Sequence, residues 1–275
     1  MLDRERKAAE VLGCVLPDAV TQIKSALGNI GAAVSALVPP EAREKDSATD
    51  QKMSILMQSY FMALRTVENL SMLQRLLDRV PLHMVNVDFV GLCRGVCVRA
   101  EHPAESKGIT LSFSCEKSSY IAAVDADMVE RLLLNLLSNA IKFTPRGGSI
   151  TVKVQLTREQ VLLTVSDTGC GISEERLETL FDTCCAERDT PAPAPHGAGV
   201  GLTLCRLIAE GHGGRIFLQS KPGGGTQVTA SFENRKLADA AVRERGFDYA
   251  GGFNRTLLEL SDALGIDAFN VKNTD

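Results

Sequence analysis

The stretch LLLNLLSNAIKF, residues 132–143, decides the fold of this chain of 275 residues. It continues an apolar pattern that predicts a helix over 127–143, with its leucines facing a core. Asn135 and Asn139 lie four residues apart and share one face of that helix. Two amides on an otherwise apolar helix need polar partners, so we expect this face to border a binding site or to bridge to another part of the protein.

The side chains on this face suit a nucleotide. A carboxamide oxygen is a good ligand for Mg²⁺, which prefers oxygen donors and shares them with substrate phosphates. Asn139 and Asn135 are therefore candidate metal ligands. Lys142 follows Asn139 by three residues and can place a positive charge near the same phosphates. The alternative is that these residues cap or bridge within the protein.

A second motif, DTGCG at 167–171, follows a predicted strand over 161–166. A carboxylate at a strand end, here that of Asp167, can accept a hydrogen bond from the amino group of adenine. Gly169 and Gly171 allow the backbone to approach a base closely and to adopt positive φ. On its own the motif is also compatible with a turn closed by an Asx hydrogen bond.

A third motif, HGAGVGL at 196–202, precedes a predicted helix over 203–210. A glycine-rich loop before a helix presents backbone N–H groups to an anion. The proline-containing segment 182–195 has no apolar period, and we expect it to form a lid over a nucleotide. The pattern is not a P-loop, since no Gly-Lys-Ser/Thr follows, and it is not a dinucleotide-binding fingerprint.

The order and spacing of these motifs resemble the GHKL, or Bergerat-fold, ATPases, and specifically the catalytic domain of sensor histidine kinases. The resemblance covers about residues 85–233 and extends more weakly to the N-terminal helices. Residues 133–148 resemble the N box, and 167–171 resemble the first glycine box. Residues 180–182 resemble the F box, and 197–202 resemble the second glycine box. Residues 211–214 resemble the His-Gly-Gly of the family, and 223–226 resemble its Gly-x-Gly-Thr.

The resemblance implies that Mg-ATP binds within residues 135–226. Asp167 would meet the adenine amino group with support from Thr226, Asn139 helped by Asn135 would bind Mg²⁺, and Lys142 would meet phosphate. Phe143, Ile172 and Leu202 would line the base pocket. The full ATP-binding set that the resemblance implies is Asn135, Asn139, Lys142, Phe143, Asp167, Gly169, Gly171, Ile172, Gly197, Gly199, Gly201, Leu202 and Thr226.

Two long helical patterns, 12–37 and 52–79, precede this part of the chain. Pro39 and Pro40 end the first pattern, and we expect the charged segment 41–50 to be a loop. Two antiparallel helices bury only one face against each other, so we expect a C2 homodimer that completes a four-helix bundle. The alternative is that both helices pack on the downstream domain.

The chain is therefore predicted to be α+β, with mostly antiparallel strands. The expected parts are a helical hairpin over 1–82, an α/β sandwich of the GHKL ATPase type over 83–234, and a C-terminal extension over 235–275 whose leucines favour docking on the body. The remaining predicted elements are helices over 88–100 and 233–245, strands over 109–114, 149–156, 215–220 and 227–232, a turn over 247–252 and a short helix over 257–264.

A working kinase of the family that this chain resembles carries a phosphorylatable histidine near the start of the first helix, in His-Glu-x-x-x-Pro. If Pro17 takes the place of the family proline, Leu12 stands at the acceptor position; other registers put Pro17 or Asp18 there. The four histidines are His83, His102, His196 and His212, so none lies between residues 12 and 37. We expect His102 to lie in a loop before Pro103.

Two functions follow. One is an ATPase of the histidine kinase type in two-component signal transduction, a transferase by resemblance, whose acceptor histidine is on another protein. The other is a catalytically inactive pseudo-kinase or phosphotransfer-like dimeric interaction module. The implied protein partners are a response regulator or a separate sensor protein.

The composition argues against other classes of protein. Net charge is −4 and no basic cluster stands out, which argues against nucleic acid as a partner. We expect a cytoplasmic protein, because no signal peptide and no apolar run of membrane-spanning length is evident. The eight cysteines lack a CxxC pair, so we expect reduced, mostly buried thiols, with a redox role left open only at Cys184 and Cys185.

Overall fold

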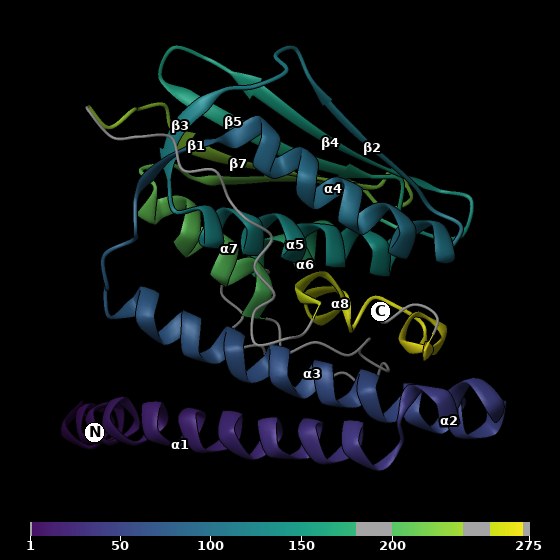
Figure 1. Ribbon diagram of the computed structural model, residues 1–275. Helices are drawn as coiled ribbons and strands as arrows, with labels where there is room; N and C mark the ends of the chain where they lie inside the picture. Colours follow the sequence, from purple (N-terminus) through teal and green to yellow (C-terminus); the bar gives the residue numbers. More distant parts are fainter. Residues whose placement is uncertain (1, 180–199, 239–253, 272–275) are drawn as a thin grey trace.

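The computed structural model describes residues 2–179, 200–238 and 254–271 (Figure 1). Its helices are α1 Leu2–Leu37, α2 Pro40–Lys45, α3 Ser47–Leu77, α4 Phe89–Ser106, α5 Ala126–Phe143, α6 Glu174–Thr179, α7 Val200–Gly211, α8 Arg255–Leu260 and the 3₁₀ helix η2 Ile266–Phe269. Its strands are β1 Val85–Asp88, β2 Thr110–Cys115, β3 Ile121–Val124, β4 Ser149–Leu156, β5 Gln160–Asp167, β6 Ile216–Ser220 and β7 Thr226–Glu233.

The larger sheet of the described residues has the strand order β2-β4-β5-β7-β6. Only the β2–β4 pair in it is parallel, which agrees with the expectation of mostly antiparallel strands. Helices α4, α5 and α7 cover one face of the sheet, as Figure 1 shows. This arrangement of helices on one face of a mixed sheet confirms the α+β prediction.

The two sides of the sheet differ in burial, as the sequence pattern predicts. In β4 the apolar residues Ile150, Val152 and Val154 are buried, whereas the alternate residues are exposed. The inward residues belong to the same core cluster as α5, in which all the leucines from 132 to 137 are buried. Burial of such a leucine contributes about 1.5–3 kcal/mol to the free energy of folding. The leucines of α5 therefore contribute strongly to the stability of the core.

Helices α1 and α3 form an antiparallel hairpin next to the ATPase-like part (Figure 1). The expected loop over 41–50 is wrong, because α2 occupies Pro40–Lys45 and α3 already begins at Ser47. Proline at the first helical position, followed by Glu41, favours a helix start. Asp46 then caps α3 by accepting a hydrogen bond from the backbone N–H of Ala48 at 3.1 Å.

Three further sequence expectations need correction. His102 lies within α4 rather than in a loop, because Pro103 sits in the last turn of a helix that continues to Ser106. The short strands β1 and β3, which pair antiparallel in a separate sheet, were not expected. The predicted helix over 233–245 does not start at Glu233, which ends β7; residues 234–237 are irregular, and 239–253 lie outside the described residues.

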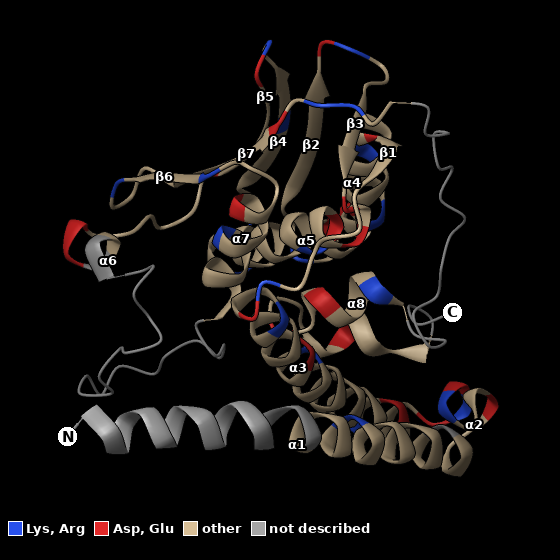
Figure 2. Ribbon diagram, turned by 90° about the vertical axis from the view of Figure 1, so that its left-hand side faces the viewer, with Lys and Arg blue, Asp and Glu red and all other residues tan. Residues whose placement is uncertain are grey.

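The C-terminal segment 254–271 lies between α3 and α5. Figures 1 and 2 both place α8 there, and contacts join α8 to α5 and α3 and join η2 to α3. Leu260 and Phe269 are fully buried, and the Phe61 and Phe269 rings are 5.8 Å apart. The segment therefore contributes apolar side chains to the junction between the hairpin and the ATPase-like part.

Candidate nucleotide site

Asp167 ends the central strand β5, and its carboxylate is oriented by backbone amides. Its Oδ1 accepts hydrogen bonds from the N–H of Gly169 at 2.8 Å and of Thr226 at 3.2 Å. Thr226 thus contributes its backbone N–H, while its hydroxyl lies 3.0 Å from the Ser220 hydroxyl. Among the described residues none donates to Oδ2, so this oxygen is available to accept from the amino group of a ligand.

Two glycines bring backbone unusually close to this carboxylate and its turn. Gly171 has φ +69, and a Cβ there would lie 1.9 Å from the carbonyl oxygen of Lys221. Gly225 has φ +78, and a Cβ there would lie 2.0 Å from the carbonyl oxygen of Asp167. Positive φ and these approaches both require glycine, so the turn after β5 and the turn before β7 pack tightly against each other. We call Asp167 and these two turns the Asp167 floor.

The C-terminus of α5 is joined to the same floor. The carbonyl oxygen of Phe143 accepts a hydrogen bond from the N–H of Cys170 at 3.3 Å, and a Cβ on Gly169 would lie 2.6 Å from that oxygen. The Phe143 side chain is 44% exposed, with the Lys142 ammonium 5.7 Å from its ring centroid. A planar base can stack on an exposed ring of this kind.

The other two apolar residues predicted for the base pocket, Ile172 and Leu202, are half-buried. Ile172 donates its N–H to the Ser220 hydroxyl at 2.9 Å, which fixes the backbone just after the glycine turn. Leu202 packs against the main core from the first turn of α7. A Cβ on Gly201 would lie 3.2 Å from Oδ1 of Asn135, so the start of α7 lies directly against α5.

Burial shapes the electrostatics of Asp167. Desolvation raises the pKa of its carboxyl above the usual 3.8, and the hydrogen bonds from Gly169 and Thr226 oppose that shift. The carboxylate therefore sits in a partly dry environment. A hydrogen bond from a ligand to such a charged, desolvated acceptor is stronger than one formed in water.

The two asparagines of α5 have different surroundings. Asn135 is 1% exposed; its Oδ1 accepts from the Arg65 guanidinium at 3.1 Å, and its amide donates to the carbonyl of Arg131 at 3.0 Å. An oxygen that faces a guanidinium does not fit a metal ion in this arrangement. Asn139 is half-exposed and forms no hydrogen bond with a described residue, so its oxygen fits a Mg²⁺ ligand.

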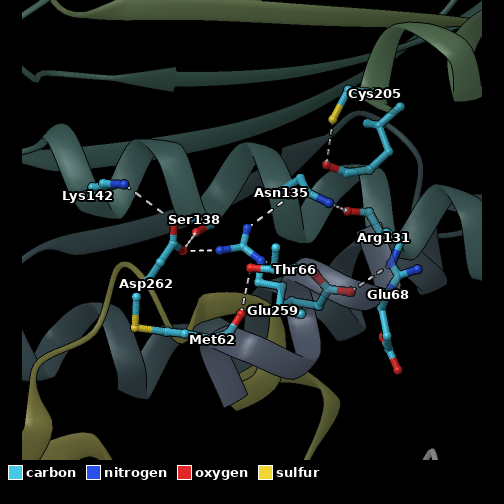
Figure 3. Close-up of polar contacts among 12 residues, drawn as sticks. Met62, Thr66, Glu68, Arg131, Asn135, Ser138, Lys142, Cys205, Glu259 and Asp262 are labelled. Carbon is cyan, nitrogen blue, oxygen red and sulfur yellow. Dashed lines mark hydrogen bonds and ion pairs between the residues drawn. The ribbon is translucent and has the colours of Figure 1, made fainter. Parts of the chain in front are cut away.

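Lys142 is engaged by a residue that the sequence motifs did not single out. Its Nζ lies 3.4 Å from Oδ2 of Asp262, which follows α8 in the C-terminal segment (Figure 3). Asp262 also accepts from the Ser138 hydroxyl at 2.7 Å and pairs with Arg65. The cation expected to meet phosphate is thus paired with a carboxylate of the same chain.

A second acid of the same segment is buried beside this cluster. Glu259 is fully buried and pairs with Arg131 at 2.8 Å; both residues are labelled in Figure 3. It also pairs with Arg65 at 3.4 Å. Arg131 also pairs with Glu68 of α3 at 2.5 Å. Sequence reasoning missed these residues, although two acids among the leucines of 257–264 were a signal that the final helix meets buried cations.

Several predicted positions lie outside the described residues. These are Gly197 and Gly199 of the second glycine box, the F box at 180–182, the expected lid over 182–195, and the pair Cys184 and Cys185.

A helix-backed sheet that ends in a glycine-cradled aspartate, next to a polar face of the neighbouring helix, defines a GHKL-type ATPase domain. Residues 124–236 match the family described as histidine kinase-, DNA gyrase B-, and HSP90-like ATPase. Together with the relatives below, this match identifies a histidine kinase core, and an ATPase domain of this family implies ATP binding.

Curated relatives are sensor kinases. The chain is 35% identical over 148 residues to an uncharacterized sensor-like histidine kinase of Rhizobium meliloti, covering 51% of this chain and 28% of that protein. It is 37% identical over 147 residues to the adaptive-response sensory kinase SasA of a Synechococcus species, covering 53% of this chain and 38% of that protein. The matches thus span only 28% and 38% of the length of these two relatives.

Solved structures share the fold. The full-length ShkA structure in complex with AMPPNP superposes with a TM-score of 0.58 at 22% identity, covering 79% of this chain and 47% of that one. The histidine kinase AdeS of Acinetobacter baumannii gives 0.51 at 18% identity, covering 66% of this chain and 85% of that one. Within the described residues, no helix combines the length and apolarity needed to cross a membrane.

Proposed function

We propose that this chain binds Mg-ATP at the Asp167 floor and acts in two-component signalling as a histidine kinase-type ATPase that does not phosphorylate itself. The observation that carries the proposal is the Asp167 carboxylate, with Oδ1 taken by two amides and Oδ2 available. An adenine amino group supplies the N–H that this oxygen accepts. The ShkA structure, whose fold is similar, contains AMPPNP, which supports a nucleotide at this fold.

The roles of the surrounding residues follow from their places. Phe143 would stack on the base, with Ile172 and Leu202 beside it and the glycine turns beneath it. Asn139 would bind Mg²⁺, which would screen the phosphate charges, and Lys142 would meet a phosphate once Asp262 no longer pairs with it. Asn135 would join the metal only if Arg65 moved away.

An alternative is a nucleotide-responsive interaction module without catalysis. The sequence favours it in one respect, because residues 2–37 contain no histidine. A kinase that modifies a histidine on another protein would also lack one. Incubation with γ-labelled ATP and an added response regulator or second kinase core separates the two, since only the kinase transfers label to another chain.

We also propose that the hairpin mediates a homodimer. Ile23 and Ile30 of α1 are 48% and 51% exposed and lie two helical turns apart on one face. Lys24 is the only charged residue between Ala19 and Leu37. The hairpin therefore presents an apolar face that a second copy of the same hairpin would cover.

The nucleotide assignment is tested by Asp167→Asn. Oδ1 of the amide can still accept from Gly169 and Thr226, but its NH₂ then points at the adenine amino group, so donor meets donor. We expect ATP affinity to fall by about 1–3 kcal/mol, the cost of an unpaired polar group. Isothermal titration calorimetry measures it.

The matched control is Glu159→Gln, the same carboxylate-to-amide change at the exposed turn at the opposite end of β5. It should leave ATP affinity unchanged. Equal affinity of Asp167→Asn and the unmodified protein would refute the assignment of Asp167 to the adenine.

A further inference from the structure

The carboxylate of Asp262 lies among cations from other parts of the fold. It pairs with Arg65 of α3 and Lys142 of α5, and it accepts from the Ser138 hydroxyl at 2.7 Å. Lys107, at the end of α4, interacts electrostatically with both Asp262 and Lys142. Side chains of Asp262 and Lys142 are only 13% and 11% exposed, so this is a largely enclosed cluster rather than a surface ion pair.

One anion surrounded by an arginine, two lysines and a hydroxyl is the arrangement that a phosphate group would also require. Lys142 is the residue that the proposed function assigns to phosphate. A carboxylate 3.4 Å from its ammonium and a phosphate on the same ammonium would repel each other at short range. Asp262 and a nucleotide phosphate are therefore competing ligands of Lys142.

The segment that carries Asp262 is held by contacts from α2, α3 and α5. At its start, Glu259 pairs with Arg65 and Arg131. At its end, Arg43 of α2 donates to the carbonyl of Phe269 at 2.8 Å, and Ser54 of α3 donates to the Asn270 side chain at 2.8 Å. The segment thus connects the hairpin to the N-box helix α5 through its own side chains.

We propose that residues 254–271 are an autoinhibitory segment, in which Asp262 takes the place of a nucleotide phosphate on Lys142 and Arg65. This inference rests on the proposed ATP site. Phosphate binding would release Asp262 and weaken the link between α5 and the hairpin. Arg65 would keep its contacts with Glu259 and Asn135 and exchange Asp262 for phosphate. Nucleotide binding and docking of the segment are then opposed by thermodynamic linkage.

The test uses Asp262→Asn in the full chain. The amide keeps the shape of the side chain, and its oxygen can keep the Oδ1 contacts with Ser138 and Arg65. Its NH₂ replaces Oδ2 opposite Lys142, and the substitution removes the competing charge. We expect Mg-ATP to bind about tenfold more tightly, the factor expected when the open arrangement is populated in about one molecule in ten. Asp267→Asn, an exposed acid of the same segment, is the matched control and should change nothing.

Hydrogen–deuterium exchange supplies a second measurement. In the unmodified protein, Mg-ATP should increase exchange at the backbone amides of α8 and η2. A purely structural segment would keep its protection from exchange when Mg-ATP binds. Asp262→Asn should show this faster exchange without nucleotide.

The outcomes separate the inference from the function. If Asp262→Asn and the unmodified protein bind ATP equally while Asp167→Asn loses affinity, the ATP site stands and the autoinhibitory segment is wrong. If neither protein binds ATP, both proposals fail. If only Asp262→Asn binds measurably, both are supported.

Discussion

At the scale of single residues, the two oxygens of Asp167 have different tasks, because backbone amides occupy Oδ1 and the ligand would use Oδ2. Burial raises the pKa of this carboxyl. We therefore expect ATP affinity to begin to fall, as the pH is lowered, at a higher pH than an ordinary aspartate with a pKa of 3.8 would give. A protonated carboxyl loses the charge that strengthens the bond.

The ratio of affinities of the unmodified protein and Asp167→Asn, measured by calorimetry at each pH, cancels the protonation of ATP itself. This ratio should shrink toward one as the pH falls. The raised pKa means that the folded state binds this proton more tightly than the unfolded state, so charged Asp167 costs stability above its folded pKa. Asp167→Asn should therefore not melt earlier at pH 7, and a ratio independent of pH would contradict the expectation.

How far the site could be predicted depends on the separation of its residues in sequence. Asp167, Gly169 and Gly171 form a contiguous motif, and their placement at the end of a strand follows from the pattern alone. The Arg65–Asp262 pair joins residues 197 positions apart. Nothing local to either residue specifies the other, since such a pair exists only after two elements have packed.

At the scale of elements, His212 joins the end of α7 to the start of α5. Its Nδ1 lies 2.7 Å from the carbonyl of Ile208, and its Nε2 accepts from the N–H of Asp125 at 3.0 Å. This pattern requires a neutral ring with the proton on Nδ1. Burial lowers its pKa below the usual 6.5.

We therefore expect stability to decrease as the pH falls below about 6.5, because the unfolded chain takes up a proton that the folded chain does not. His212→Phe keeps a ring beside Phe232 but leaves the Asp125 N–H unpaired. This variant should lose about 1–3 kcal/mol at pH 7, and it should lack the acid dependence from this residue. Urea unfolding at pH 7.5 and 5.5 measures both effects, and an identical pH dependence of the two proteins would disprove the role of His212.

Elements with a clear apolar period were detected from the sequence, whereas several of the shortest ones were not. The strand at 149–156 agrees with β4 to the residue, and the helix at 127–143 differs from α5 by one residue. These elements have a full apolar period. By contrast, β1 and β3 have four residues each. A run of this length cannot show a period, so tertiary pairing decides its conformation.

At the scale of the whole molecule, the proposed dimer places the apolar face of the hairpin against a second copy. We expect Ile23→Glu combined with Ile30→Glu to convert a dimer to a monomer, because each substitution would bury an unpaired charge in the interface. Light scattering coupled to size exclusion measures the mass. Val98→Glu is the control, since Val98 is 62% exposed on α4 and lies outside the hairpin. A monomeric unmodified protein at high micromolar concentration would refute the dimer.

The last prediction concerns phosphoryl transfer within the chain. We expect no acid-labile, base-stable label on residues 1–275 after incubation with γ-labelled ATP. Transfer requires a neutral imidazole nitrogen placed about 3–3.5 Å from the phosphorus and in line with the leaving group. No histidine lies on α1, where the resemblance to kinases places the acceptor.

The positions of the three histidines that the structure describes support this expectation. His212 is buried with both ring nitrogens engaged. His83 precedes β1, and His102 lies near the end of α4; both are exposed, and neither is on α1. Label that persists in the unmodified chain but disappears from a His83→Gln, His102→Gln double variant would show that the protein is a kinase with a displaced acceptor. Label transferred only to an added response regulator or second kinase core would instead identify a kinase that acts on another chain.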